Sequence, residues 1–558
     1  MKRTRWYKDA FIYQIYPRSF CDSNGDGIGD LRGIISKLDY LKELGVTAVW
    51  LSPCYKSPND DNGYDISDYR DIMDEFGTLE DWEEMVEGMH KRGIKLIMDL
   101  VVNHTSDEHY WFQEARKSKD NPYRDYYIWR KGKGKNGKKP PNNWTSRFGG
   151  SAWEYCEETD EYYLHLFTKK QPDLNWKNPK VRQEVHDIVK YWLDKGCDGF
   201  RCDVITYIAK EDGLPDGRWN IALRGDEHFN NHPTIHSYLH ALNKEVLSNY
   251  DCMTVGEGPG MNVENAIKYT SEENEELDTV FTFEHMNTDT YFQLIPRKFK
   301  LSRLKKVFAK YQHGLRNKGW NSLYFENHDQ PRCLPRFVGD YGPYRKQAAK
   351  MLAVALYMQQ GTPYIYQGQE IGMTNYPWKS LDEFQDVMVK YVMGVINKIA
   401  PFLKGYVFKV MKWRARDNAR TPMQWNDEEN AGFTTGKPWL PVNPNYKEIN
   451  VADAMKDEDS IFHFYKKLIR FRLGNKIIIH GTFRQMYEKS NDIYCYERSY
   501  EGQRLMVICN FKNKEVGFKL PAEVVYDSAE LVLHNYDYDR KLEDMKLRPY
   551  EAMVFLLK

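Results

Sequence analysis

Short apolar segments recur along the chain, and stretches of helical periodicity separate most of them. Eight segments are rich in β-branched and aromatic residues, at 11–16, 48–52, 96–101, 199–204, 253–256, 280–283, 322–325 and 363–366. The segments 78–90 and 181–193 carry apolar residues at helical spacing, and Thr78 is a suitable N-cap for the first. Alternating strands and helices over this length predict an α/β fold, a (β/α)8 TIM barrel of parallel strands. An open doubly wound sheet is the alternative, although no G-x-G-x-x-G motif follows the first segment.

The regular spacing is interrupted twice and then changes near the C-terminus. Residues 105–174 are rich in Gly, Pro, Asn and aromatic residues, and a loop of this length is uncommon without structure of its own. We therefore expect an inserted subdomain after the third strand. A second excursion follows the eighth strand, and short alternating strands dominate after about residue 476.

These changes predict four segments. The barrel occupies 1–104 and 175–478, the inserted subdomain 105–174, and a C-terminal antiparallel β-sandwich 479–558.

Composition narrows the possible partners. Of 558 residues, 80 are Lys or Arg and 80 are Asp or Glu, and this balance argues against a nucleic-acid partner. No apolar run approaches the roughly 20 residues that cross a bilayer, and the N-terminus lacks the apolar core of an export signal. Nine cysteines without a CxxC motif fit reduced thiols. We expect a cytoplasmic protein, a monomer or weak homo-oligomer, that binds small molecules and neither nucleic acid nor membrane.

Charged side chains gather where the predicted strands end. Asp99 and His104 close the third strand, Asp203 the fourth, Glu257 the fifth and Asp329 the seventh. Because the active site of such a barrel lies at the C-terminal ends of its strands, these side chains should converge. A single carboxylate at a strand end is usually a helix cap or a loop ion pair, but several arriving together favour catalysis.

Cleavage of a glycosidic bond requires two carboxyl groups in different protonation states. One must be ionised to attack the sugar, and the other must carry a proton for the leaving group. Arg201 lies two residues before Asp203, so both side chains should face the same side of the strand. A cation there would favour the ionised form of Asp203.

The segments that carry these residues resemble the signature regions of the α-amylase superfamily, glycoside hydrolase family thirteen. The matching segments are 99–104, 199–203, Glu257 and 327–329. Further segments resemble regions typical of its oligo-1,6-glucosidase subfamily, at 62–68, 148–153, 171–176 and 416–425. The likeness extends over essentially the whole chain.

The resemblance implies a retaining, exo-acting α-glucosidase with Asp203 as nucleophile, Glu257 as acid/base and Asp329 as a carboxylate that grips the sugar. It implies substrate-binding roles for Asp65, His104, Phe148, Phe167, Gln171, Arg201, Val204, His328 and Arg420. Asp65 and Arg420 are expected to pair and close the far end of a pocket; each alone could equally form a surface ion pair.

The residue after the nucleophile is Val204, and in the resembled subfamily Val at this place accompanies α-1,6 bonds, while Thr or Ala accompanies α-1,4 bonds. We therefore expect isomaltose and short oligosaccharides as substrates, with some α-1,4 activity. Gly258 stands where relatives usually carry Met, which would enlarge the leaving-group side.

Oxygen-bearing residues alternate in the loop after the first strand. Asp22, Asn24, Asp26 and Asp30 offer side-chain oxygens, and Ile28 offers its carbonyl. The resemblance implies a single structural Ca²⁺ here, with no organic cofactor. A loop of Asx turns without metal is the alternative.

Three other functions are compatible with parts of the sequence. A sucrose isomerase would carry an Arg-rich loop before the seventh strand, and 295–303 lacks it. A trehalose-6-phosphate hydrolase would need a basic cluster for the phosphate, which the sequence does not reveal. A non-catalytic scaffold of amino-acid transporters would have a membrane anchor and eroded acids, whereas this chain has all three acids.

Overall fold

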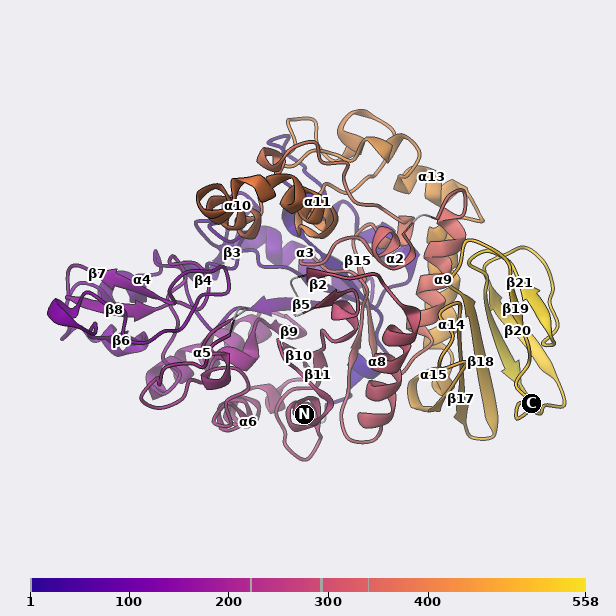
Figure 1. The fold of residues 1–558 in the computed structure, drawn as a ribbon, viewed down its shortest axis with the longest axis horizontal. Coiled ribbons are helices and arrows are strands. Elements are labelled where there is room, and N and C mark those ends of the chain that lie inside the picture. The colour runs from indigo at the N-terminus through magenta and orange to yellow at the C-terminus, as the bar shows by residue number, and fades with distance from the viewer. Residues whose placement is uncertain (1–2, 221–222, 292–294, 340) are drawn as a thin grey trace.

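The chain is described from a computed structural model, over residues 3–220, 223–291, 295–339 and 341–558. Eight parallel strands form one sheet in the order β11-β10-β9-β5-β2-β1-β15-β14. A parallel bridge between Val280 of β11 and Asn321, next to β14, brings the two outer strands together. The sheet therefore curls into a nearly closed barrel at the centre of the molecule (Figure 1), and the predicted (β/α)8 fold is confirmed.

All eight predicted segments contain a barrel strand. The strands are β1 Ile12–Ile15, β2 Ala48–Leu51, β5 Lys95–Leu100, β9 Gly199–Cys202, β10 Met253–Glu257, β11 Thr279–Phe281, β14 Ser322–Leu323 and β15 Thr362–Tyr366. Every residue of β1, β2, β9, β10 and β15 is buried, as expected for strands with helices outside and side chains inside the barrel. This burial on both faces explains why the sequence shows apolar runs rather than alternation.

Helices that connect the strands begin at recognisable caps. Helix α3 (Leu79–Lys91) starts with a capping box in which Thr78 and Asp81 satisfy each other's backbone amides. Helix α5 (Pro179–Asp194) starts with Asn178 as cap and proline in its first turn. The two predicted helices are therefore present, within a residue or two of the expected bounds.

The predicted insertion forms a small lobe beside the barrel. Helix α4 (Tyr110–Ala115) leads into an antiparallel sheet of β6 (Trp129–Arg130), β8 (Glu161–Leu164) and β7 (Trp153–Cys156). The lobe projects from one side of the barrel (Figure 1). Its last residues return to the barrel through a bridge between His104 and Asp173, which brings the lobe's base to the end of β5.

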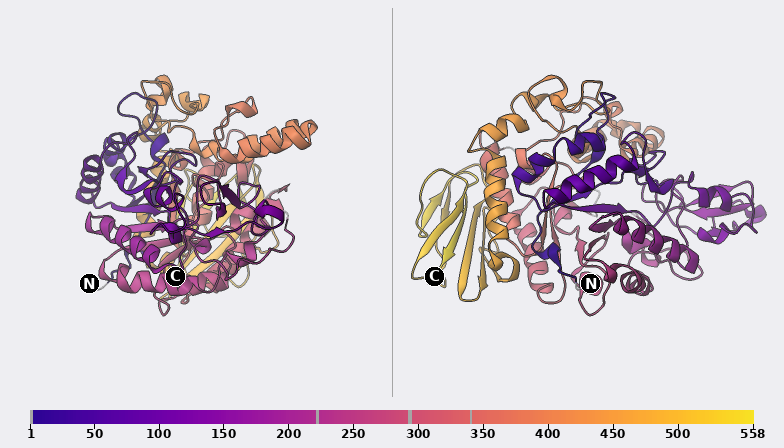
Figure 2. Two further views of the ribbon diagram at one scale, coloured as in Figure 1. Left: turned by 90° about the vertical axis from the view of Figure 1, so that its left-hand side faces the viewer. Right: turned by 180° about the vertical axis from the view of Figure 1, so that it is seen from behind.

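After β15 the chain forms a helical hairpin that was not predicted from the sequence. Helix α10 (Val387–Ile399) and helix α11 (Lys404–Arg414) contact each other and project from the body of the molecule (Figure 2). Ile399 and Phe402 at the turn are 77% and 83% exposed. We call residues 387–414 the hairpin.

The C-terminal part is an antiparallel β-sandwich, as predicted. Five strands pair in the order β16-β17-β18-β22-β20, and two more, β19 (Val516–Phe518) and β21 (Met545–Leu547), pair separately. The five are β16 Thr482–Met486, β17 Ile493–Tyr500, β18 Gln503–Asn510, β22 Ala552–Leu557 and β20 Ala529–His534. Phe518 and Leu547 share an apolar core with residues of the larger sheet.

Among the described residues, no helix is long and apolar enough to cross a membrane. All nine cysteines are buried and free, and burial raises the pKa of Cys202, next to Asp203, to about 12. Cys202 is therefore a small buried apolar residue at neutral pH, not a reactive thiolate.

Candidate active site

The register of three adjacent strands brings the predicted catalytic residues together. Asp99 of β5 and Val255 of β10 both lie opposite Arg201 of β9. Asp203 follows β9 directly, and its amide donates to the carbonyl of Leu100, which keeps it at the strand end. Glu257 is the last residue of the adjacent strand, β10. The parallel register thus carries one cation and three acids to the same end of the barrel.

Arg201 is the centre of a buried charge cluster. Its Nη1 lies 2.5 Å from an oxygen of Asp99 and 2.5 Å from an oxygen of Asp203, and its Nη2 lies 2.6 Å from Glu257. The Arg201 side chain is 1% exposed. Burial raises the pKa of Asp203 well above its usual range, and Arg201 opposes this rise. One guanidinium cannot neutralise three carboxylates, so Arg201 does not cancel the rise in the pKa of Asp203, contrary to the expectation that this cation would decide its ionisation.

Asp329 has the opposite electrostatic environment. His328 lies 3.2 Å from it, and Arg416 and Arg420 lie 3.3 Å and 2.9 Å away. Burial alone would raise the pKa of Asp329, but these neighbours hold it well below its usual range. Asp329 therefore stays ionised and is able to accept hydrogen bonds from sugar hydroxyls.

His104 and His328 are held by buried partners. Burial lowers the pKa of His104 to about 4, so the ring is neutral at neutral pH. Its Nε2 lies 3.0 Å from the carbonyl of Tyr64, and the side-chain amide of Gln171 donates to the same carbonyl at 3.1 Å. His328 stacks on the Tyr64 ring, and its Nε2 lies 2.7 Å from the Tyr64 hydroxyl. Tyr64 thus links both predicted histidines to the loop after β2.

A cavity of about 340 Å³ opens above these groups, a volume typical of a small-ligand site. Seven predicted residues line it: His104, Phe148, Phe167, Asp203, Val204, Glu257 and Asp329. The remaining five predicted residues lie off its wall: Asp65, Gln171, Arg201, His328 and Arg420. Of these, Gln171, Arg201, His328 and Arg420 contact the wall residues His104, Asp203 and Asp329 from behind.

The expected pair of Asp65 and Arg420 is not formed. Asp65 is fully buried and accepts the backbone amides of Asp60 and Asp61, at 2.8 and 3.0 Å. Asp61 instead lies on the cavity wall, 3.6 Å from Arg416, which also lines the cavity. The acid–arginine pair on the cavity wall is therefore Asp61 and Arg416. Asp65 fixes the loop that presents Asp61, because its two oxygens each bind one amide of that loop.

The sequence contained the signal for this pair, but it was ambiguous. Three acids occur within six residues of one loop, at 60, 61 and 65, and two arginines lie four residues apart, at 416 and 420. Only the backbone turn decides which members face the cavity. Tyr64 and Asp386, which binds Arg416 at 2.7 Å, were also not predicted as site residues, whereas Asp99 was expected to converge with the acids but was given no role.

Val204 occupies an unusual backbone conformation. Its φ of 33° and ψ of 40° lie in the left-handed region, which β-branched residues rarely adopt. Its amide donates to Glu257 at 3.3 Å, and its side chain packs in an apolar cluster with Tyr207 and Phe229. These contacts hold the strained residue beside both catalytic carboxyls.

The proposed metal loop forms a series of Asx turns. Asp22, Asn24 and Asp26 each accept the amide two residues further on, and Asp30 caps helix α1 (Leu31–Ile35). Among residues 3–220, 223–291, 295–339 and 341–558, no cluster of three or more His, Cys, Asp or Glu has the arrangement of a metal site. All candidate ligand atoms are oxygens, which suits a hard cation such as Ca²⁺. The hydrogen bonds within the loop are equally consistent with a loop that Asx turns stabilise without metal.

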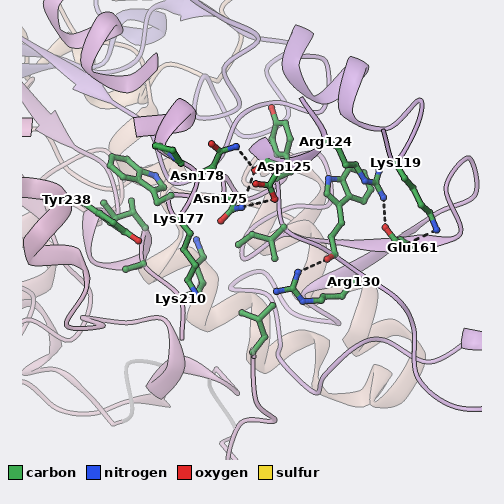
Figure 3. Close-up of a pocket in the computed structure, with 18 residues that line it drawn as sticks. Lys119, Arg124, Asp125, Arg130, Glu161, Asn175, Lys177, Asn178, Lys210 and Tyr238 are labelled. Carbon is green, nitrogen blue, oxygen red and sulfur yellow. Dashed lines mark hydrogen bonds and ion pairs between the residues drawn. The ribbon is translucent and has the colours of Figure 1, made fainter. Parts of the chain in front are cut away.

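A second cavity, of about 600 Å³, lies between the inserted lobe and the barrel (Figure 3). Asn175 and Asn178 donate to Asp125 there, and Lys119 and Arg124 pair with Glu161. No predicted catalytic residue lines it. The larger volume of this cavity is therefore no reason to place the reaction there.

Comparison with known proteins agrees with this geometry. Residues 14–481 match the family model "Alpha amylase, catalytic domain", and residues 493–554 match "Alpha-amylase SusG C-terminal domain". Oligo-1,6-glucosidases of Parageobacillus thermoglucosidasius and Bacillus cereus are each 57% identical, covering 99% of this chain and 99% and 100% of their own. The crystal structure of trehalose-6-phosphate hydrolase from Bacillus licheniformis superposes with a TM-score of 0.94 at 47% identity, covering 99% of this chain and 100% of that one. The chain is a glycoside hydrolase and belongs to the α-amylase family, within its oligo-1,6-glucosidase subfamily.

Proposed function

We propose that this enzyme removes single glucose residues from the non-reducing ends of isomaltose and short α-1,6-linked oligosaccharides, with weaker action on α-1,4 bonds. The observation that carries the proposal is that the nearly buried pair of Asp61 and Arg416 lines the same cavity as Asp203 and Glu257. In this proposal the pair closes one end of the cavity, so that only a terminal sugar can enter, which implies exo-action. The names of the curated relatives, oligo-1,6-glucosidases, support the linkage.

The residues divide the chemistry as follows. Asp203 attacks the anomeric carbon while Glu257 gives its proton to the departing oxygen, which breaks the glycosidic bond. Water, deprotonated by Glu257, then releases glucose from Asp203. Asp329 accepts hydrogen bonds from the glucose hydroxyls, and Arg201 spreads the negative charge of both reacting carboxyls.

A substrate panel tests this function directly. Isomaltose should give the highest kcat/KM among isomaltose, maltose, sucrose, trehalose and trehalose 6-phosphate. A preference for maltose would overturn the linkage, and a preference for trehalose 6-phosphate would replace the function by that of the hydrolases for this sugar phosphate.

We predict that the first-formed glucose is the α-anomer. Retention needs two carboxyl groups about 5–5.5 Å apart, without room for a water between nucleophile and sugar. Asp203 and Glu257 approach one guanidinium, each within 2.6 Å, so they are close neighbours. Proton NMR in the first minutes of isomaltose hydrolysis reports the anomer before mutarotation. Initial β-glucose would reject double displacement.

We predict that Val204→Thr shifts the enzyme toward maltose. The side chain at 204 lines the cavity next to Glu257, where the leaving sugar departs. A hydroxyl in place of a methyl changes which acceptor hydroxyls find a partner, an effect typically worth about 10–200-fold in discrimination. The ratio of kcat/KM for isomaltose to that for maltose should therefore fall. Val525→Thr makes the same exchange on an exposed site and should leave the ratio unchanged. An unaltered ratio in Val204→Thr would remove Val204 as the determinant.

We propose that Asp22, Asn24, Asp26, Ile28 and Asp30 hold one structural Ca²⁺. An ion bound only by the folded protein stabilises it, by about 2.7 kcal/mol at a hundredfold excess over Kd. We predict that exhaustive chelation lowers the melting temperature by several degrees while kcat of the remaining folded enzyme is kept. Elemental analysis should find one calcium per chain. Absence of bound metal together with an unchanged melting temperature would leave the Asx-turn loop as the complete explanation.

We also propose that the enzyme works in the cytoplasm as a monomer or weak homo-oligomer on small sugars. Nine free, buried cysteines support a reducing compartment. Light scattering across a concentration series measures the oligomeric state.

A further inference from the structure

The hairpin, which projects from the body of the molecule (Figure 2), exposes a group of apolar side chains where its two helices meet. Among the described residues, six of the thirteen exposed large apolar side chains belong to the hairpin. Four of the six lie close together in sequence at the turn: Ile399, Phe402, Leu403 and Tyr406. We call these four residues the tip. An exposed apolar group of this kind marks an interaction site.

The hairpin also concentrates positive charge. It contains five lysines and one arginine, and no Asp or Glu. All five lysines are exposed: Lys390, Lys398, Lys404, Lys409 and Lys412. Since the whole chain is neutral, the residues outside the hairpin carry a net charge of −6. The neutrality of the chain is therefore an average over two parts of opposite sign, and it conceals a strongly basic segment.

The charge of the lysines is not neutralised by the protein. Arg414 forms the one ion pair of the hairpin that the described part of the chain contains, with Asp289 at 3.8 Å, and it faces the active-site cavity. The five lysines contact no carboxylate within that same part of the chain. Lys390 donates to the side-chain oxygen of Gln385, and Lys412 lies 5.9 Å from the centre of the Phe408 ring. The lysines are therefore available to an anionic partner outside the molecule.

An anionic lipid surface matches both properties of the hairpin. Aliphatic and aromatic side chains enter the boundary between headgroups and acyl chains, and lysines meet the phosphates above it. A tyrosine such as Tyr406 suits the same boundary, because its ring is apolar and its hydroxyl is polar. A second copy of the chain fits less well, since two tips would bring two sets of unpaired lysines together. The negative remainder of the protein is repelled by the same surface, so the hairpin alone should face it.

We propose that the hairpin binds the surface of an anionic lipid bilayer, with the tip inserted among the headgroups and the lysines at the phosphates. The association is peripheral and reversible, because the tip offers only four apolar side chains. The proposal does not depend on the glycosidase function, since no residue of the tip lines the cavity that contains Asp203 and Glu257.

Sedimentation with lipid vesicles tests the proposal on the full chain. We expect the enzyme to pellet with vesicles of phosphatidylcholine and phosphatidylglycerol in equal amounts, and to stay in solution with phosphatidylcholine alone. Salt at about 0.5 M shortens the Debye length to about 4 Å and should release most of the enzyme. No pelleting with the anionic vesicles would overturn the proposal. Equal pelleting with both vesicles would exclude anionic lipid as the partner.

Two double variants locate the binding site. Ile399→Gln with Phe402→Gln should weaken binding to the anionic vesicles by about tenfold or more, because it removes the two most exposed apolar side chains of the tip. Lys398→Gln with Lys404→Gln should weaken it by about 25-fold, since each lysine near such a surface contributes about fivefold. Melting temperatures show whether the variants are folded. Wild-type binding in both folded double variants would exclude the hairpin as the binding site.

Matched controls make the same exchanges elsewhere on the surface. Val525→Gln replaces an apolar side chain of the C-terminal sandwich that is 75% exposed, and Lys91→Gln replaces a lysine of α3 that is 66% exposed. Both should bind anionic vesicles as the wild type does, and a loss equal to that of the double variants would overturn the assignment to the hairpin.

Sedimentation velocity without lipid tests the alternative partner. We expect Ile399→Gln with Phe402→Gln to leave the oligomeric state unchanged. A dimer that this double variant disperses, in an enzyme that does not bind anionic vesicles, would assign the tip to a second copy of the chain and overturn the proposal.

Discussion

Asp203→Asn is expected to lower kcat on isomaltose by roughly 10⁴-fold or more. An amide is a poor nucleophile and carries no charge to stabilise the positive character that develops at the anomeric carbon. The fold should persist, because Asn has almost the shape of Asp, and Arg201 keeps Asp99 and Glu257 as partners. Initial rates, with circular dichroism and melting temperature for folding, measure both expectations.

Asp212→Asn is the matched control for this loss. It makes the same exchange on a side chain that is 94% exposed and paired with Lys177, and full activity is expected. A folded Asp203→Asn enzyme with activity near that of the wild type would show that another residue is the nucleophile.

Arg201→Met is expected to lower both activity and stability. The substitution leaves Asp99, Asp203 and Glu257 buried without their shared cation, and removal of one partner from a buried ion pair typically costs about 3–5 kcal/mol. Arg201→Lys keeps the positive charge, but the single ammonium group of Lys cannot contact all three carboxyls as the planar guanidinium does. The activity and stability of this variant should therefore lie between those of Arg201→Met and the wild type. The free energy of unfolding, from urea titration, measures the loss.

The stability loss of Arg201→Met should depend on pH in a defined direction. Burial already raises the pKa of Asp99 and of Asp203, and without the cation both folded-state values rise further. The folded variant then holds protons that the unfolded chain releases above about pH 4, so its deficit grows from pH 4 upward. Urea titrations at pH 5 and pH 8 should show the larger loss at pH 8. Adding Asp99→Asn to the variant should recover part of the loss at pH 8, and no recovery would mean that buried charge is not its cause.

Elements with a repeated local pattern were predictable from sequence. The eight barrel strands show short apolar runs, and helix α3 with its cap at Thr78 shows apolar residues at helical spacing. Tertiary packing uses both patterns directly. Three strands of the C-terminal sandwich, β16, β20 and β21, have a weaker pattern. Their burial is partial, for example exposed and intermediate residues at most positions of β20, so their apolar signal is weak.

The candidate site was predictable where one strand end decides the position. Asp203 follows β9 directly and Glu257 ends β10, so the barrel leaves both side chains little choice of direction. Asp65 and Arg420 lie in long loops, where the turn rather than the spacing selects the residue that faces the cavity. Asp61 and Arg416 were missed for this reason. The hairpin was missed because Val389 and Val407 are the only buried residues of its two helices, so it carries no continuous apolar stripe.

The hairpin is one uninterrupted stretch between β15 and the C-terminal part, whereas the reacting groups come from the barrel strands. The reacting groups and one wall of their cavity are thus encoded in separate segments of the gene. Mutations in 387–414 can reshape that wall while the barrel register that aligns Asp99, Arg201 and Val255 stays intact. This separation makes the hairpin an exchangeable module, on which selection can act without rebuilding the catalyst.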